Sequence, residues 1–181
     1  MRYYYFYALQ LLTNAHFRFV QFLPKRLLMT YPRILQKNLH RVQEWLYDIE
    51  DYGGWSDTTT SLTCLRIVLH HLRNHLPPAN LAHLSAQLPL FIRGLLFENW
   101  NPEHKPVKER KRDEFLDAIE QDLENHPEIS ADQAVQAVFC ALRRKISDGE
   151  IEKLKSVLPN PISALFDDDC LPAFSTFLNT A

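Results

Sequence analysis

The sequence predicts an all-α protein with two similar sets of four helices, which pack as one compact helical unit. Apolar residues recur at intervals of three and four in several segments, as in helices with one buried face. In addition, residues 115–166 repeat residues 45–96 without gaps at an offset of 70, with eleven identities in fifty-two positions. Unrelated segments of ordinary composition would give about three. A repeat of this kind specifies a scaffold of packed helices.

The first repeat, residues 35–100, is expected to hold four helices. The first helix runs over residues 36–51, and the second carries a seam of leucines from Leu62 to Leu76. The third and fourth helices are shorter. Glycine, proline and capping residues separate the four, since these residues end or begin helices: Gly53-Gly54, Ser56-Asp57, Pro77-Pro78 and Pro89.

The second repeat, residues 113–166, follows the same plan. Ser130 with Gln133 and Ser147 with Glu150 have the spacing of a capping box. In that motif the serine accepts a bond from the third backbone N–H, and the third side chain returns a bond to the serine N–H. We therefore expect helices to begin directly after each serine.

Three segments fall outside the repeats: a basic N-terminal arm at 1–34, a polar linker at 101–112 and a tail at 167–181. The charge is unevenly spread, because residues 1–43 carry +7 and residues 44–181 carry −9. The arm could lie on the acidic body, or it could bind nucleic acid or anionic lipid. A third interpretation is that residues 1–28, which precede Met29, lie upstream of the natural start.

Cysteine content and hydropathy bear on the compartment. Cys64, Cys140 and Cys170 are far apart, odd in number and form no CxxC motif, which favours reduced thiols and a cytoplasmic location. No stretch of eighteen apolar residues predicts a membrane span. Nucleophile elbows, Walker loops and GxGxxG motifs do not occur, so we assign no catalytic residue and no cofactor.

Histidines and carboxylates offer only weak candidates for chemistry. His71 and His75 share a helical face and could hold Zn²⁺. However, no glutamate follows His71 as in HExxH, and the second repeat has Ala141 and Lys145 at these places. We therefore expect exposed histidines and no metal site. The acidic residues near the end of the first helix are likewise expected to be solvated: Asp48, Glu50 and Asp51.

Differences between the repeats single out another set of residues. Leu88-Pro89 recurs in both repeats and is therefore assigned to the fold. Gln87, Arg93 and Trp100 occur only in the first repeat, and the second has Val157, Ser163 and Cys170 in their places. We take these three residues as a candidate interaction surface and expect them to lie close together. Arg93 either pairs with a carboxylate or contacts a partner; the candidate carboxylates are Glu98, Asp113 and Glu114.

The string Ala86-Gln87-Leu88-Pro89-Leu90-Phe91-Ile92-Arg93-Gly94, followed by Trp100-Asn101-Pro102, resembles the signature of a bacterial family called domain of unknown function 2267. The resemblance extends over about residues 35–166. It implies an all-helical, intracellular, prokaryotic protein, and it brings no established activity. One departure is Asn99, where the family usually has glycine; asparagine tolerates left-handed backbone angles better than most residues.

These observations favour a non-catalytic protein-interaction or regulatory module with an unknown protein partner. One alternative is a nucleic-acid-binding protein that uses the basic arm and the mixed-charge run at 105–112. Another is an enzyme with an unfamiliar site near Arg93, for which His83 is the nearest titratable candidate in the sequence.

Overall fold

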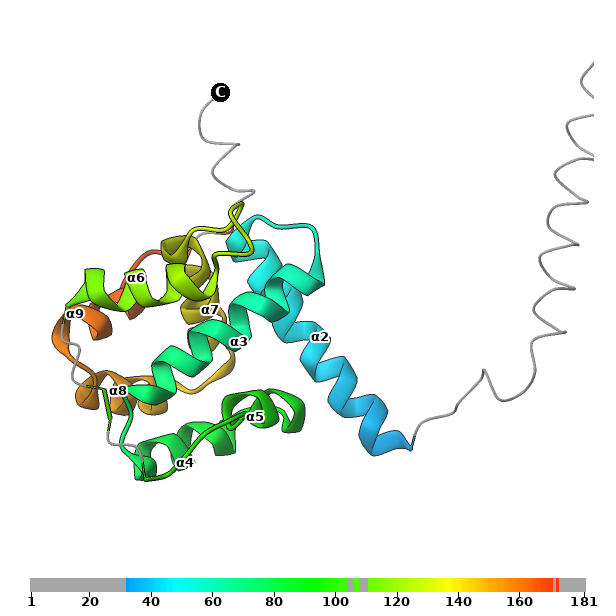
Figure 1. Ribbon diagram of the computed structural model, residues 1–181. Helices are drawn as coiled ribbons and strands as arrows, with labels where there is room; N and C mark the ends of the chain where they lie inside the picture. The colour runs from blue at the N-terminus through cyan, green and yellow to red at the C-terminus, as the bar shows by residue number, and fades with distance from the viewer. Residues whose placement is uncertain (1–31, 104–105, 108–110, 171, 173–181) are drawn as a thin grey trace, which may run out of the picture. The chain divides into compact units, whose positions relative to one another are not determined.

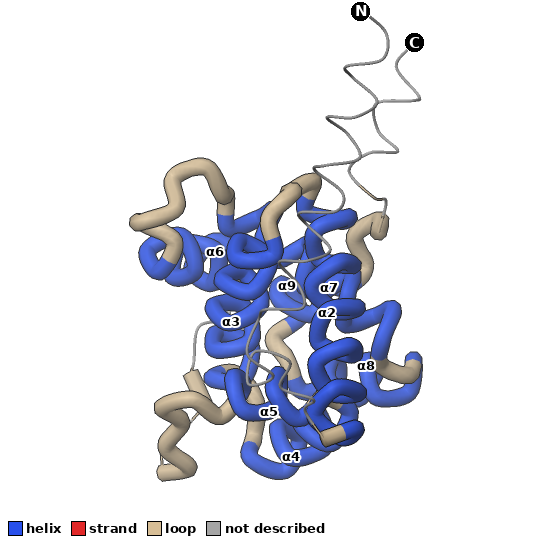
Figure 2. The backbone as a smooth tube through the Cα atoms, turned by 90° about the vertical axis from the view of Figure 1, so that its right-hand side faces the viewer, coloured by secondary structure: helices blue, strands red, loops and turns tan. Residues whose placement is uncertain are grey.

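The regular elements of the computed structural model are all helical over the residues that it describes, which are 32–103, 106–107, 111–170 and 172. Figure 2 draws these helices in blue and shows no strand among them. The predicted all-α class is therefore confirmed. The chain divides into two units, Met1–Gln36 and Lys37–Ala181. Most of the predicted basic arm lies outside the described residues, and the packing reported below belongs to the second unit.

Eight α-helices and one 3-10 turn follow one another in the described part of the chain. The bounds of α4 and α8 differ by 70 residues at both ends, and α5 and α9 begin 70 residues apart. The bounds of α2 and α6, and of α3 and α7, depart from an offset of 70 at both ends. The pseudo-repeat and the superposition of the two halves therefore stay predictions. The elements are α2 (Arg33–Gly53), α3 (Thr58–Asn74), α4 (Pro78–Gln87), α5 (Leu90–Leu96), α6 (Arg112–Asp122), α7 (Ala131–Lys145), α8 (Asp148–Val157), α9 (Asn160–Ser163) and η1 (Ala164–Phe166).

The core is built around α3 and α7, which pack against each other. In Figure 1, α3 runs between α4 and α5 on one side and α6 and α7 on the other. α3 also contacts α5 and α6, while α4 packs against α8. The leucine seam of α3 is buried, and Leu65, Leu69 and Leu72 have no exposed surface. Burial of this face, at about 25 cal/mol per Å² of apolar area, is what holds these short helices in place.

Helix caps agree with the sequence in part. Asp57 accepts bonds from the backbone N–H groups of Thr59 (3.1 Å) and Thr60 (3.2 Å), so it caps α3 as predicted. These bonds lower the pKa of Asp57, since they favour the charged carboxylate. Pro77 and Pro89 occupy the N-cap positions of α4 and α5, where their missing N–H costs no helical bond.

The two predicted capping boxes do not form as such. Ser130 Oγ accepts from the Gln133 N–H at 3.3 Å, but the Gln133 side chain donates to a backbone carbonyl at the end of α2 instead of returning to Ser130. Ser147 makes no side-chain cap bond, and Glu150 pairs with Lys153 at 2.6 Å. The box at Ser147 is therefore wrong. In both cases the side chain three residues after the serine has another partner: Gln133 bonds to α2, and Glu150 pairs with Lys153 of its own helix.

Two equivalent arginines hold the chain that follows the last helix of each half. Arg73 Nη1 donates to the carbonyls of Leu96 (2.7 Å) and Glu98. Arg143 Nη1 donates to the carbonyl of Asp168 at 2.9 Å. Glu98 and Asp168 are 70 residues apart, like the arginines themselves. The arginine that the two halves share therefore makes an equivalent contact to a backbone carbonyl in each half.

Two predictions about polar residues are wrong. Asp48 is buried, because its carboxylate lies 3.1 Å from Arg144 Nη1 and 2.8 Å from Lys145 Nζ at the end of α7. His75 is also buried and His71 mostly so, and both rings pack edge-on against Phe115 of α6. Helical spacing identifies one buried face of a helix, but it does not say that another helix covers a second face.

The cysteines also differ from the prediction. Cys140 and Cys170 form a disulfide with a Cα–Cα distance of 5.4 Å. It links α7 to the segment that follows η1, although thirty residues separate the two positions in sequence. Cys64 is a buried free thiol, and burial raises its pKa to about 12. Two of the three cysteines are thus paired, which removes the argument for a reduced compartment.

Candidate functional site

Gln87 and Arg93, two of the three predicted surface residues, line the same groove. The groove has a volume of about 390 Å³ and lies between α2 and the corner where α4 meets α5. We call it the α2–α5 groove. Its other lining residues come from four helices, α2, α4, α5 and α7, and from the α4–α5 turn: Asn38, Arg41, Glu44, Trp45, Ala86, Leu90 and Lys145 among them.

Arg93 is half-buried and binds the last turn of α4. Its Nε donates to the Ser85 carbonyl at 2.8 Å, and its Nη2 lies 3.4 Å from the Leu88 carbonyl. The Ser85 carbonyl also accepts from the Leu88 backbone N–H at 3.3 Å. The guanidinium therefore adds a further donor to the carbonyls at the end of α4, where intrahelical donors run out. No carboxylate among the described residues lies within ion-pair distance of Arg93, because Glu98 pairs with Arg66 instead. The predicted ion pair is therefore not formed.

The charged residues that line the α2–α5 groove differ in whether they have an ion-pair partner. Glu44 pairs with His40 at 3.3 Å, and Lys145 is held by Asp48. Arg41 is exposed and has no ion-pair partner in the part of the chain that the structure describes. The guanidinium groups of Arg41 and Arg93 are thus the positive charges that the groove offers to a ligand.

Apolar surface adjoins these charges at the start of α5. Leu90, which lines the groove, is 61% exposed, and the neighbouring Phe91 is 47% exposed. The buried face of α5 belongs to Ile92 and Leu96 instead. Two large apolar side chains are thus exposed beside the guanidinium groups of Arg41 and Arg93.

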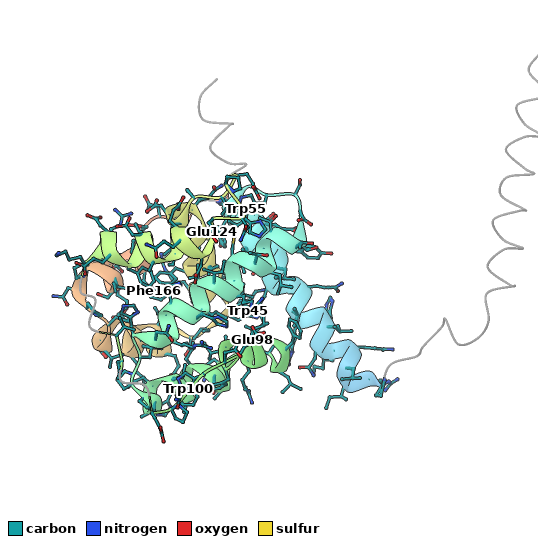
Figure 3. All side chains as sticks on the ribbon, in the orientation of Figure 1. Trp45, Trp55, Glu98, Trp100, Glu124 and Phe166 are labelled. Atoms are coloured by element: carbon teal, nitrogen blue, oxygen red, sulfur yellow. A yellow bond between two sulfur atoms is a disulfide. The ribbon has the colours of Figure 1, made fainter. Side chains whose placement is uncertain are left out.

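Trp100 does not belong to this groove. It lines a separate pocket of about 360 Å³ together with Arg73 and Asn99. Figure 3 shows Trp100 apart from Trp45, which lines the α2–α5 groove. The expectation that all three residues share one neighbourhood is therefore not met. After α5 the chain turns at Asn99, whose φ of 55° lies in the left-handed region that asparagine tolerates, and this turn leads Trp100 away.

A third hollow, of about 480 Å³, contains titratable groups that the sequence did not mark as a site. Arg66 Nε lies 2.7 Å from a Glu98 carboxylate oxygen. His70 Nε2 donates to the Leu95 carbonyl at 2.8 Å, and burial lowers its pKa despite that bond. These contacts join α3 to the end of α5. The imidazole is therefore neutral near pH 7 and serves a structural bond.

Residues 42–165 match the family described as "Uncharacterized conserved protein (DUF2267)". The match covers more than half of the chain. This chain belongs to the DUF2267 family. The resemblance carried by the residue 86–94 string and Trp100 is thereby confirmed. A search of curated proteins finds no match to the chain.

Other chemistry in this DUF2267 chain can be placed from the described residues. His83 is exposed and does not line the α2–α5 groove. Within the described residues, no group of three His, Cys, Asp or Glu side chains is arranged to hold a metal ion. Among them, too, every helix falls short of the length and apolarity needed to cross a membrane.

Residues of the basic run at 105–112 are described only in part. Lys111 pairs with Glu114 at 2.8 Å, which raises the pKa of Lys111, and Arg112 pairs with Asp132. Both cations are thus matched by carboxylates. Lys105, Lys108 and Arg110, like residues 1–31, lie outside the described residues.

Proposed function

We propose that this DUF2267 protein is a non-catalytic interaction module, and that the α2–α5 groove binds an acidic protein segment that carries a large apolar side chain. The observation that carries the proposal is the joint position of Gln87 and Arg93. Both are special to the first half, and both line the groove beside the unpaired Arg41 and the exposed Leu90.

Charge and apolar surface support a partner of this chemistry. Arg41 can donate to a carboxylate in a bidentate pair, the geometry for which arginine is suited. Arg93 adds its positive charge and the N–H groups that do not donate to the Ser85 and Leu88 carbonyls. Glu44 contributes a carboxylate to the same lining, but three cations outnumber it there: Arg41, Arg93 and Lys145. Leu90 can contact an apolar side chain, which supplies affinity that exposed ion pairs alone do not.

We also infer that the two halves are a true pseudo-repeat in which the first half has acquired the binding surface. The shared helix bounds and the equivalent contacts of Arg73 and Arg143 support this inference. Ser163 stands in place of Arg93 in the second half, and its hydroxyl bonds to the Asn160 carbonyl of its own turn. The corresponding corner of the second half therefore forms without an arginine at this position.

The alternatives differ in what they require. A nucleic-acid-binding role needs the arm and the 105–112 run to present unpaired cations, and an enzyme needs a titratable group beside Arg93. The pairing of Lys111 and Arg112 and the exposed position of His83 outside the groove favour the interaction module. A cytoplasmic location remains a prediction, and the Cys140–Cys170 disulfide is an argument against it.

Selection of peptides from a random phage-displayed library against the full chain tests the proposal. We expect peptides with Asp or Glu near a large apolar residue. Arg41→Glu and Leu90→Ser should each weaken their binding at least about tenfold, the loss of about 1.4 kcal/mol. Two control variants change similar exposed residues elsewhere, Lys153→Glu on α8 and Tyr47→Ser on α2, and should leave the affinity unchanged.

Three results would contradict the proposal. First, the selected peptides could fail to compete with one another for a single site. Second, they could lack acidic residues. The selected peptides could also bind the groove variants as well as the original chain. Nucleic acid that stays bound after purification and is released by nuclease would instead support the alternative role.

A further inference from the structure

Arg73 is a buried cation without a carboxylate in contact with it. Arg73 is only 7% exposed, and burial lowers the pKa of its guanidinium. Nη1 donates to the Leu96 and Glu98 carbonyls, and Nε donates to the Asn74 side chain at 3.3 Å. The Glu98 carboxylate pairs with Arg66 instead. Buried charges are ordinarily matched by an opposite charge in contact with them. Among the described residues no carboxylate lies within ion-pair distance of Arg73, and the Glu98 carboxylate acts on it only from farther away.

The remaining surface of Arg73 borders the pocket that contains Trp100. At about 360 Å³ the pocket lies within the size range of small-molecule sites. Three asparagine side chains and a few apolar residues complete its lining: Asn74, Asn99, Asn101, Leu76, Pro78 and Val107. The pocket thus offers one guanidinium, one indole and several amide groups, with apolar walls between them.

Two contacts fix the walls of this pocket. The Val107 backbone N–H donates to the Asn74 carbonyl at 2.8 Å, which brings the chain after the Asn99 turn back across α3. The rings of Phe97 and Trp100 meet edge-on with centroids 5.3 Å apart, so the indole has a defined support. Trp100 itself is only partly buried and packs at the margin of the core.

The second half shows that the fold does not need such a pocket. Arg143 makes the equivalent backbone contact, to the Asp168 carbonyl. Cys170 stands at the position of Trp100, is bonded to Cys140 and places its Sγ 3.2 Å from Arg143 Nη1. Arg144 stands at the position of Asn74 and pairs with Asp48. The indole and the amides are therefore additions in the first half beyond what its arginine requires.

We propose that this pocket binds a small organic carboxylic acid with a flat ring. The carboxylate would pair with the Arg73 guanidinium, the ring would lie against the Trp100 indole, and the asparagine amides would bond its polar edge. Arginine pairs carboxylates in fixed geometry, and an indole favours flat rings. A carboxylate is favoured over a phosphate dianion, because Arg73 is the one cation among the described residues that line the pocket.

Calorimetric titration of the full chain with four probes tests this ligand class. Benzoate should bind with saturation at millimolar concentration or below. Benzamide lacks the charge, cyclohexanecarboxylate lacks the flat ring, and inorganic phosphate lacks the ring and carries more charge. Each should bind at least about tenfold more weakly than benzoate. Benzoate should also change the fluorescence of Trp100, an effect that Trp100→Leu should abolish.

Matched variants separate ligand binding from support of the fold. Arg73→Lys and Arg143→Lys keep the charge but lose the planar donor pair, and both should lower the thermal midpoint because each arginine holds backbone carbonyls. Only Arg73→Lys should weaken benzoate binding, again by about tenfold or more. Trp100→Leu should weaken it similarly, and this variant does not depend on whether Arg73→Lys folds.

Several outcomes would overturn the proposal. These are the absence of saturable benzoate binding, equal binding of benzamide or cyclohexanecarboxylate, and tighter binding of phosphate than of benzoate. Unchanged benzoate affinity in Trp100→Leu would also overturn it, as would an equal loss of affinity in Arg143→Lys. The proposal concerns a pocket distinct from the α2–α5 groove, so peptide binding to the groove can fail without affecting these results.

Discussion

At the scale of single residues, Arg93 combines a structural contact with a place in the groove. Its guanidinium bonds the Ser85 and Leu88 carbonyls, which end α4, and no buried carboxylate depends on it within the described residues. Loss of the side chain would therefore leave carbonyls that water can partly solvate, and would strand no opposite charge. The energetic effect should be that of lost hydrogen bonds to a charged donor rather than that of a broken buried ion pair.

Arg93→Ala should accordingly lower the free energy of unfolding by about 1–3 kcal/mol. Urea denaturation followed by circular dichroism measures this change. Arg41→Ala is the matched control in the same groove, and it should stay within about 0.5 kcal/mol of the original chain because Arg41 is exposed and forms no ion pair with any described residue. An Arg93→Ala chain as stable as Arg41→Ala would show that the α4 carbonyls do not need the guanidinium.

The sequence predicted which residues are special better than it predicted their surroundings. Comparison of the repeats singled out Gln87 and Arg93, which do line one groove. It could not place Trp100, because the turn at Asn99 decides the direction of the chain. Asp48 and His75 were expected in solvent, yet α7 and α6 cover them. Such contacts depend on residues forty to nearly a hundred positions away in the sequence, which local periodicity cannot report.

At the scale of helices, the periodicity of three and four gave every α-helix of the two repeats, because each short helix must bury one apolar stripe. The ends marked by proline or Asp57 were predictable, since they depend on local backbone chemistry. The Ser147 box failed because Glu150 has Lys153 on its own helix as a competing partner. The disulfide could not be predicted from the sequence, since the spacing of Cys140 and Cys170 does not indicate that they lie close together.

The disulfide gives a prediction about how the segment after η1 is held to α7. Chain purified without reductant should show no reactive thiol when folded and one thiol when denatured, because Cys64 is buried and the other two cysteines are paired. Cys170→Ser should lower the free energy of unfolding by about 2–4 kcal/mol through the lost cross-link. Thiol titration and denaturation measure these quantities, and three thiols in the denatured, unreduced chain would contradict the pairing.

The relation between the halves gives a second prediction at this scale. In an experimental structure, α3, α4 and α5 should overlay in order on α7, α8 and the α9–η1 turn. Leu72 should fall on Leu142, and Pro89 on Pro159. The reason is that the identities include residue pairs buried in both halves, such as Leu72 and Leu142, and the N-cap prolines Pro89 and Pro159. A best overlay that shifts the sequence offset away from 70 residues would end the pseudo-repeat interpretation.

At the scale of the whole molecule, the core of the described part of the chain is formed within one of the two units. Its buried apolar residues begin at Val42 and end at Phe166, and they form one cluster. All of them belong to the unit Lys37–Ala181. The net charge of +7 in residues 1–43 arises largely before this core begins. Stability and the N-terminal charge should therefore be separable by truncation.

A chain that begins at Met29 should keep its thermal midpoint within about 2 °C of the full chain, because the described core contains no residue from before that point. Differential scanning calorimetry of the two chains measures the difference. A chain that begins at Gly54 is the comparison for a truncation that enters the core. It lacks Trp45, Leu46 and Ile49, which are buried, and it should lose many degrees or fail to fold. If the chain from Met29 loses as much as the chain from Gly54, apolar residues of the arm must contribute to the core, and the division between a basic arm and an independent helical body would be wrong.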